Sequence, residues 1–261
     1  MWEEFIKLEE ELSGSFEEKF IERFKHYNMP SEFTEHIMHP SPYLNIYAYP
    51  EELDYLDIRP LPAKWQRFDH FIRMTEKDSS FSVPEDFLAK PLGKLIYFSL
   101  GSMGCADIDL MTRLITQIFA HSPNRFILSL GPEEAKLRKL LGENMWGARF
   151  VPQMSVLPLV DLVITHGGNN TTLESLYHGK PVLVTPLFGD QRDNAQRVTE
   201  CGYGGRIKPY TCESEEFLEL IEELLGNQKM RQRVLALSAR MQASNSTEKA
   251  AWAIESLAYN K

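Results

Sequence analysis

The chain has 261 residues, of which 43% are hydrophobic and 25% are charged. This composition is typical of a globular protein with one large domain or two modest ones. The formal net charge of −9 argues against nucleic acid or an anionic membrane surface as the main partner, because both reward clustered lysine and arginine. No run of about 18 apolar residues is present, so we expect no membrane span.

The cysteines and the N-terminus indicate a cellular compartment. The three cysteines, Cys105, Cys201 and Cys212, are scattered and lack the spacing of a metal site. Their odd number and their scatter predict reduced thiols, which are typical of a cytosolic protein. The N-terminal stretch MWEEFIKLEEE is acidic and has no continuous apolar core, unlike a signal peptide. We therefore expect a cytoplasmic protein with no metal site.

The chain before Lys94 predicts only scattered regular structure. Residues 1–27 have apolar positions at helical spacing, and Gly14 is expected to separate two helices. Residues 43–49, YLNIYAY, lie between two prolines and predict a strand. Residues 51–93 are interrupted by prolines and predict a long linker with one short helix.

From Lys94 onward, short apolar runs alternate with helical patterns. The predicted strands are residues 94–100, 125–130, 148–151, 162–165, 182–186 and 204–207. The predicted helices are residues 107–120, 133–141, 169–179 and 191–201, followed by a helical tail at 215–259. Nearly continuous apolar strands that alternate with helices indicate a parallel sheet covered on both faces. The predicted fold class is therefore α/β, with a Rossmann-like parallel sheet.

Polar residues gather where the predicted strand 162–165 meets the next helix. His166 and two glycines precede Asn170 and Thr171. Free N–H groups and the positive end of the helix dipole favour an anion at such a corner. Taken alone, His166 would more often be a core or cap residue, and Asn170 and Thr171 could be N-cap residues. A cap and a phosphate site use the same unpaired N–H groups, so the two roles are compatible.

Residues 149–196 resemble the signature of the UDP-dependent glycosyltransferases, a family with the GT-B fold that glycosylates small molecules. The family pattern is aromatic-x-Pro-Gln, then His-x-Gly-x-Asn-Ser/Thr-x-x-Glu, then Asp-Gln-x-x-Asn-Ala. The matching residues are Phe150, Pro152, Gln153, His166, Gly168, Asn170, Thr171, Glu174, Asp190, Gln191, Asn194 and Ala195. Polar identities in register over about 45 residues make this signal strong. The sequence is most similar to the soluble arthropod and bacterial members.

The resemblance implies a site for a UDP-sugar at the carboxyl ends of the strands. It implies that Phe150 stacks on uracil, with a smaller π face than the tryptophan that the family most often has. It also implies that Gln153 hydrogen-bonds the base or the ribose, and that Glu174 accepts hydrogen bonds from ribose hydroxyls. A capping-box role for Glu174 is the alternative. The full set of expected UDP-sugar-binding residues is Ser102, Phe150, Val151, Gln153, His166, Gly168, Asn170, Thr171, Glu174, Asp190 and Gln191.

The remaining roles concern the diphosphate and the sugar. The resemblance implies diphosphate contacts from His166 and from Ser102, which lies at the first strand-to-helix corner. It directs Asp190 and Gln191 at the sugar hydroxyls, since neighbouring acceptor and amide groups suit a polyol. Without the motif, these two residues would be interpreted as a surface turn. Gln191 resembles the residue of glucose users, whereas galactose users tend to have histidine at that position.

The resemblance also implies a second Rossmann-like domain that carries the acceptor site and a histidine base backed by an aspartate. No histidine before His166 has the expected setting, so we assign no catalytic base. We expect residues 1–50 to be the last part of the N-terminal acceptor domain and 51–93 to be the linker. We expect 94–243 to be the donor-binding domain and 244–261 to be a helix that packs back toward the N-terminal part.

The predicted function is transfer of a hexose, with glucose favoured, from a UDP-sugar to a small hydroxylated lipophilic acceptor. On this interpretation the chain is a fragment that supplies the donor-binding half of an inverting enzyme. The alternative is a shortened product that binds a UDP-sugar without transfer. No cofactor is implied, because the UDP-sugar is a co-substrate. The expected partners are the donor and the acceptor, with no nucleic acid and no membrane.

Overall fold

The computed structural model describes residues 18–29, 40–56, 60–72 and 81–259. The chain divides into two compact units, of which the first comprises residues 1–46 and 62–66 and the second comprises residues 47–61 and 67–261. In the first unit, residues 18–26 form a helix, in agreement with the predicted helical pattern. The predicted helix before Gly14 lies outside the described residues.

Two short strands form a small sheet of their own. Strand β1, Asn45–Ala48, pairs with β2, Trp65–Phe68. The first of these confirms the strand predicted at 43–49. The second was not predicted, because the prolines before it indicated irregular chain. Helix α2, Glu85–Leu88, is a short helix of the kind expected between residues 51 and 93.

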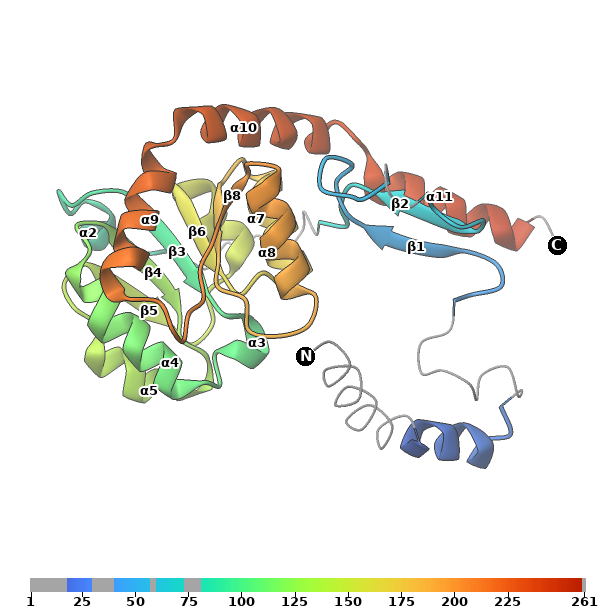
Figure 1. Ribbon diagram of the computed structural model, residues 1–261, viewed down its shortest axis with the longest axis horizontal. Helices are drawn as coiled ribbons and strands as arrows, with labels where there is room; N and C mark the ends of the chain where they lie inside the picture. Colours follow the sequence, from blue (N-terminus) through green and yellow to red (C-terminus); the bar gives the residue numbers. More distant parts are fainter. Residues whose placement is uncertain (1–17, 30–39, 57–59, 73–80, 260–261) are drawn as a thin grey trace. The chain divides into compact units, whose positions relative to one another are not determined.

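The second unit contains a six-stranded parallel sheet with the strand order β5-β4-β3-β6-β7-β8 (Figure 1). The strands are β3 Leu95–Ser99, β4 Arg125–Ser129, β5 Met145–Ala148, β6 Leu162–Thr165, β7 Val182–Val184 and β8 Gly204–Arg206. This confirms the predicted Rossmann-like α/β class. The order reverses beside β3, because the chain adds β4 and β5 on one side and β6 on the other. Ligands of open parallel sheets bind at such a reversal, beyond the carboxyl ends of the strands.

One strand lies a few residues earlier in the chain than predicted. The strand predicted at 148–151 is β5, which ends at Ala148 paired with Ser129. The apolar residues that suggested a later strand, Phe150 and Val151, instead belong to the segment that leaves the sheet. Phe150 therefore lies beyond the carboxyl edge and not within a strand.

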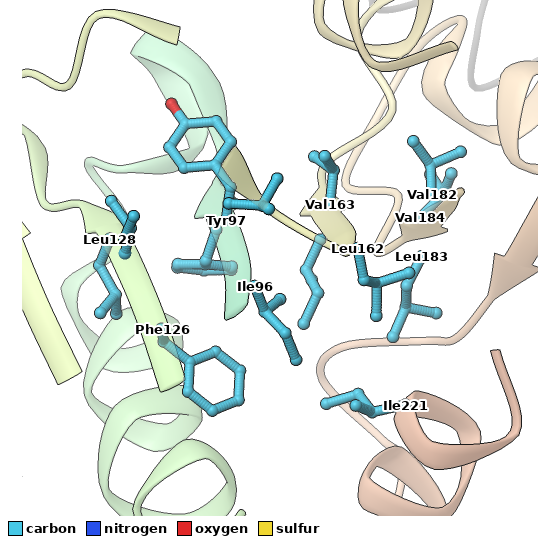
Figure 2. Close-up of a cluster of buried hydrophobic side chains, with 14 of the residues drawn as sticks. Ile96, Tyr97, Phe126, Leu128, Leu162, Val163, Val182, Leu183, Val184 and Ile221 are labelled. Atoms are coloured by element: carbon cyan, nitrogen blue, oxygen red, sulfur yellow. The ribbon is translucent and has the colours of Figure 1, made fainter. Parts of the chain in front are cut away.

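The core fills both faces of the sheet. Strands β3, β6 and β7 are buried along their whole length. Figure 2 shows Ile96 and Phe126 on the side of Ile221 of α9, Ser214–Gly226, whereas Tyr97 and Val163 point to the other side. Burial on both faces explains why these strands are nearly continuous in apolar residues.

Helices cover both faces of the sheet (Figure 1). Helix α9 packs on the π-helix Leu114–Ile118 that continues α4, Ile108–Arg113. Helix α7, Asn169–Tyr177, packs on α8, Gln191–Glu200, and on α10, Gln228–Gln242. The further bounds are α3 Gly101–Gly104, α4 Ile108–Arg113, the π-helix Leu114–Ile118, the 3-10 turns Phe119–His121, Gly131–Glu133, Arg138–Leu140 and Leu157–Leu159, α5 Glu134–Leu137, α6 Gln153–Val156, α7 Asn169–Tyr177, α8 Gln191–Glu200, α10 Gln228–Gln242 and α11 Ser246–Tyr259.

The predicted helical patterns are more divided than expected. The stretch 107–120 changes from α-helix to π-helix to 3-10 turn. The tail expected as one helical region breaks at Asn227, whose side chain caps α10 by accepting from the Met230 N–H. It breaks again at Asn245, where φ is +49°.

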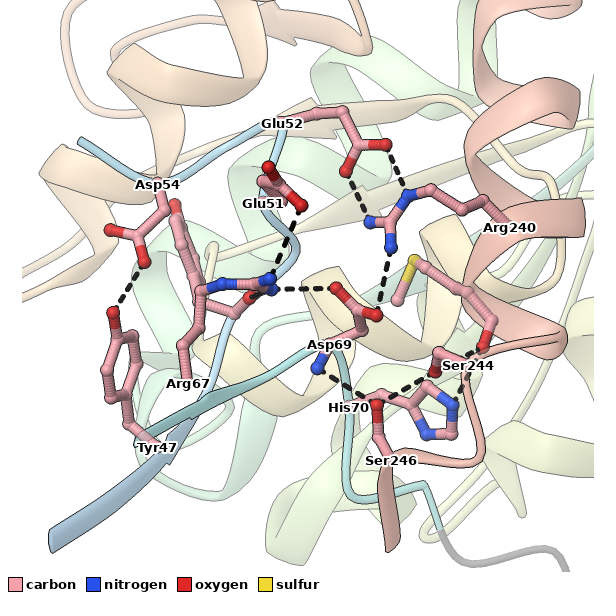
Figure 3. A network of polar contacts seen from close by, with 12 residues as sticks. Tyr47, Glu51, Glu52, Asp54, Arg67, Asp69, His70, Arg240, Ser244 and Ser246 are labelled. Atoms are coloured by element: carbon pink, nitrogen blue, oxygen red, sulfur yellow. Dashed lines mark hydrogen bonds and ion pairs between the residues drawn. The ribbon is translucent and has the colours of Figure 1, made fainter. Parts of the chain in front are cut away.

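A network of ion pairs joins the segments around residues 51 and 68 to α10 (Figure 3). Arg67 Nη1 lies 2.7 Å from Asp69 Oδ1, and Arg240 Nη1 lies 2.9 Å from Asp69 Oδ2. Arg67 also pairs with Glu51, and Arg240 with Glu52. Burial alone would raise the pKa of Asp69, but hydrogen bonds from Arg240 and Arg67 hold it below its ordinary value. The network therefore fixes the chain near residue 52 to α10 within the second unit.

Candidate functional site

A cavity of about 970 Å³ opens around the carboxyl ends of β3 and β4. Its volume is that of a typical small-molecule site. Its wall comes from the loops after β3, β4 and β5 and from helices α6 and α7. The predicted site residues that line it are Ser102, Phe150, Val151, Gln153, Asn170, Thr171 and Glu174. The structure thus gathers most of the predicted set from separate loops onto one cavity.

The segment after β5 presents an aromatic ring at the cavity. Phe150 is 74% exposed, whereas its neighbour Val151 is 2% exposed. The buried valine anchors the segment in the core and leaves the phenyl ring outside it. A flat exposed ring at a cavity wall can stack on a planar ligand group.

A hydrogen bond connects two parts of the cavity wall. Gln153 is the first residue of α6, and its Nε2 donates to Glu174 Oε2 of α7. The N-cap position of α7 is Gly168, and no side chain caps the helix there. Glu174 therefore has a partner across the cavity and does not complete a capping box. Neither Asn170 nor Thr171 is the N-cap residue, and both line the cavity.

His166 lies between two glycines at the strand-to-helix corner. An added Cβ at Gly101 would be 2.6 Å from its Cε1, and one at Gly168 would be 2.5 Å from its Nε2. Gly101 itself lines the cavity and has a φ of +70°. Glycine is required at these two positions, since a larger residue would displace the imidazole.

Burial lowers the pKa of His166 below its ordinary value, although a hydrogen bond to the Ser99 backbone and the charge of Asp190 oppose the shift. The imidazole is therefore neutral at pH 7, with one ring N–H to donate. Its Nδ1 lies 3.2 Å from Thr165 Oγ1. His166 is not among the residues that line the cavity, but its ring packs directly behind Gly101.

The last part of the motif, at the start of α8, lies outside the cavity wall. Asp190 is exposed and accepts from Asn194 Nδ2 at 3.2 Å. Gln191 is only 3% exposed. Its Oε1 accepts from the backbone N–H of Leu187 at 2.8 Å and of Phe188 at 3.1 Å. The structure therefore gives Gln191 a role in holding the loop after β7.

Several cavity residues were missed by the sequence analysis. Tyr97, Ser99 and Ser129 line the cavity floor at the ends of β3 and β4, and Arg149 lines its wall. Burial raises the pKa of Tyr97 to about 12, while hydrogen bonds with the Ser99 and Ser129 side chains oppose this. These residues carry no motif. Their position at the carboxyl ends of parallel strands is the signal that could have found them.

The described residues also bear on metal binding and on membranes. Within the described ranges, no three His, Cys, Asp or Glu side chains are grouped as a metal site would require. None of the helices in that part of the chain has the length and apolar character that crossing a bilayer requires. Cys105, Cys201 and Cys212 are all free thiols.

Solved glycosyltransferases have a similar fold. The glycotransferase of kitacinnamycin superposes with a TM-score of 0.75 at 20% identity, covering 94% of this chain and 62% of that protein. Os79 from O. sativa, solved in complex with UDP, superposes with a TM-score of 0.55 at 23% identity, covering 69% of this chain and 44% of that protein. These likenesses show that the architecture is of the GT-B type.

The sequence comparisons identify the family. UDP-glucuronosyltransferase 2B14 of Oryctolagus cuniculus is 31% identical over 147 residues, which are 56% of this chain and 27% of that protein. The chain thus matches little more than a quarter of that relative's length. The model of the family described as UDP-glucoronosyl and UDP-glucosyl transferase matches residues 86–254. Because this match covers most of the chain, the chain belongs to the UDP-glucoronosyl and UDP-glucosyl transferase family.

Proposed function

We propose that the cavity binds the UDP part of a UDP-hexose and that the chain supplies the donor-binding half of a hexosyltransferase. The observation that carries this proposal is the convergence of motif residues from separate loops on one cavity. The UDP bound to the O. sativa protein of similar fold supports a uridine nucleotide as the ligand.

In the proposed complex, the nucleoside lies between the exposed ring of Phe150 and the Gln153–Glu174 pair. Uracil stacks on the ring, which is 74% exposed. The ribose hydroxyls donate to the Glu174 carboxylate, whose orientation is fixed by the hydrogen bond from Gln153. A carboxylate accepting charge-assisted hydrogen bonds gives a stronger contact than a neutral acceptor would.

The diphosphate lies at the corner before α7. Ser102, Asn170 and Thr171 line that part of the cavity, and the imidazole of His166 packs behind Gly101, where a bound diphosphate favours its protonated form. The N-terminus of α7 adds unpaired backbone N–H groups and the positive end of its dipole. All of these groups stabilise negative charge.

The proposed reaction is displacement at the anomeric carbon of the sugar. An acceptor hydroxyl loses its proton to a base, its oxygen bonds to the anomeric carbon, and the bond to the diphosphate oxygen breaks. The electron pair of that bond leaves with UDP, and the configuration inverts. The contribution of this chain is to orient the donor and to stabilise the charge on the leaving diphosphate. We propose that Asp190, which is exposed at the start of α8, addresses the sugar hydroxyls and that the sugar is glucose. The Gln191 expected to share this role is buried and bonded to the Leu187 and Phe188 N–H groups, so it holds the loop beside Asp190.

Calorimetry with UDP in the presence of a chelator tests nucleotide binding. We expect saturable binding of UDP and UDP-glucose. No heat at millimolar UDP would contradict the proposal. Heat that appears only after magnesium or manganese is added would contradict the metal-independent form of binding.

A second measurement separates transfer from binding alone. The alternative to the transferase half is a module that binds the donor without transferring it. The assay measures UDP release from UDP-glucose with and without a phenolic acceptor. Acceptor-dependent release would assign transfer to this chain, whereas binding without release would assign it donor binding only.

A further inference from the structure

Residues 48–54, which we call the strap, hydrogen-bond to the helices that follow β6 and β7. Asn169 Nδ2 of α7 donates to Ala48 O at 3.1 Å. Arg197 of α8 donates to Leu53 O at 2.7 Å and to Asp54 O at 3.0 Å. The strap is thus fixed to α7 and α8, which carry the later parts of the family motif.

One strap side chain reaches a motif residue. The Tyr49 hydroxyl donates to Asn194 Oδ1 at 3.0 Å. Asn194 is only 5% exposed, and its Nδ2 donates to Gly167 O at 2.8 Å and to Asp190 Oδ2 at 3.2 Å. The asparagine amide therefore connects the strap to the glycine corner beside His166 and to the carboxylate at the start of α8.

The three hydrogen bonds permit one orientation of the amide. Rotated by 180°, it would direct Oδ1 at the Gly167 carbonyl and the Asp190 carboxylate, which are both acceptors. The Tyr49 hydroxyl can donate or accept, so the orientation is set by the Gly167 carbonyl and the Asp190 carboxylate, and in that orientation the hydroxyl donates to Asn194 Oδ1. Burial raises the pKa of Tyr49 above its ordinary value, so the hydroxyl keeps its proton.

We propose that Asn194 and Tyr49 are positioning residues for the sugar donor, with Asn194 holding Gly167 and Asp190 in place and Tyr49 holding Asn194. This inference rests on the proposed function, because Asp190 matters only if a sugar lies beside it. Gly167 precedes the diphosphate corner, and Asp190 faces the sugar. Loss of the hydrogen bonds made by Tyr49 and Asn194 therefore weakens the binding of UDP-glucose more than the binding of UDP.

The test compares two tyrosine-to-phenylalanine variants by calorimetry with UDP-glucose and UDP. Y49F removes the hydroxyl that contacts Asn194. Y47F is the matched control, because it also removes a tyrosine hydroxyl from this region, and that hydroxyl donates to Asp54 Oδ2 at 2.5 Å (Figure 3). We expect Y49F to lower the affinity for UDP-glucose by about three- to ten-fold. We expect Y47F to leave this affinity unchanged.

A double variant asks whether Tyr49 acts through Asn194. In the N194A background, Y49F should have no further effect on UDP-glucose affinity, because the group it orients is absent. A spectroscopic readout needs no ligand: the side-chain amide resonances of Asn194 in the ligand-free chain should shift in Y49F and stay in place in Y47F. If only the ring of Tyr49 mattered, Y49F would change neither the affinity for UDP-glucose nor the Asn194 amide resonances.

The outcomes separate this inference from the proposed function. Equal UDP-glucose affinities for Y49F, Y47F and the wild-type chain would overturn the inference and leave the proposed function intact. An undiminished effect of Y49F in the N194A background, or unchanged Asn194 amide resonances, would also overturn it. A wild-type chain that binds no UDP-glucose would overturn the proposed function and the inference together.

Discussion

The two parts of the family motif use their side chains in opposite ways. Between Phe150 and Glu174, the motif presents an aromatic ring, a carboxylate and small polar groups to an open cavity. At the start of α8, the same motif is directed inward, because Gln191 and Asn194 are buried and hydrogen-bonded to the protein. The first part is arranged to contact a ligand, and the second part is arranged to hold its own backbone. Substitutions in the cavity part of the motif should therefore lower the affinity for UDP. Substitutions in the α8 part should lower the free energy of unfolding.

The largest effect is expected at the carboxylate of the cavity. E174A should reduce the binding free energy of UDP by about 1.5–3 kcal/mol, because a charged hydrogen-bonding partner of the ribose is lost. Calorimetry with pyrophosphate should show little change, since that ligand has no ribose. E216A, which removes an exposed carboxylate on α9, is the control. Equal losses for UDP and pyrophosphate would instead indicate that Glu174 only supports the helix.

The next effect concerns the aromatic ring. F150A should weaken UDP by about 1–3 kcal/mol through loss of stacking on the base, while F150W should strengthen it because the indole offers a larger face. W252A is a matched control, since Trp252 is 71% exposed and Phe150 is 74% exposed, and Trp252 does not line the cavity. If W252A lowered the affinity for UDP as much as F150A does, stacking of the base on Phe150 would be contradicted.

At the buried Gln191, we expect a loss of stability and not of UDP affinity. Q191A leaves the Leu187 and Phe188 N–H groups without their acceptor, so denaturant unfolding should show about 1–2 kcal/mol less stability. UDP affinity should stay nearly constant. Q232A, at an exposed position of α10, should change stability by less than about 0.5 kcal/mol. A Q191A chain of wild-type stability would show that the α8 corner does not hold its backbone in this way.

The smallest effect is a pH dependence from His166. Burial lowers the pKa of this histidine in the free chain, and a nearby diphosphate favours the imidazolium and raises the pKa again. The complex therefore binds more protons than the free chain, and UDP-glucose affinity should rise a few-fold as the pH falls from 8 to 6. H166Q should flatten this profile, and H121Q at an exposed position should not. A profile unchanged in H166Q would exclude His166 as its source.

Much of the sheet could be predicted because its strands are long apolar runs. Buried strands such as β3 and β6 have no polar interruption, so their limits differ from prediction by little. Strand β5 was displaced because Phe150 and Val151 look like strand residues, although one is exposed and the other is buried after the chain has left the sheet. Strand β2 carries no such run, since most of its residues are exposed or half-buried.

The resemblance predicted several of the residues that line the cavity, but Asp190 and Gln191 lie outside its wall. It did not predict how the residues contact one another. Tyr97 and Ser129 meet there because β3 and β4 are neighbours, a fact of strand order that local sequence does not contain. The contact between Tyr49 and Asn194 spans 145 positions, so no local pattern indicates it. The inward orientation of Gln191 depends on the path of the loop before it, which the family pattern does not describe.

A crystal structure of the chain with UDP tests most directly whether the cavity is the nucleotide site. We expect uracil stacked on Phe150, the ribose hydroxyls on Glu174, and the diphosphate at the start of α7 beside Ser102 and Asn170. UDP bound at another surface, with the cavity empty at saturating concentration, would contradict the proposed function.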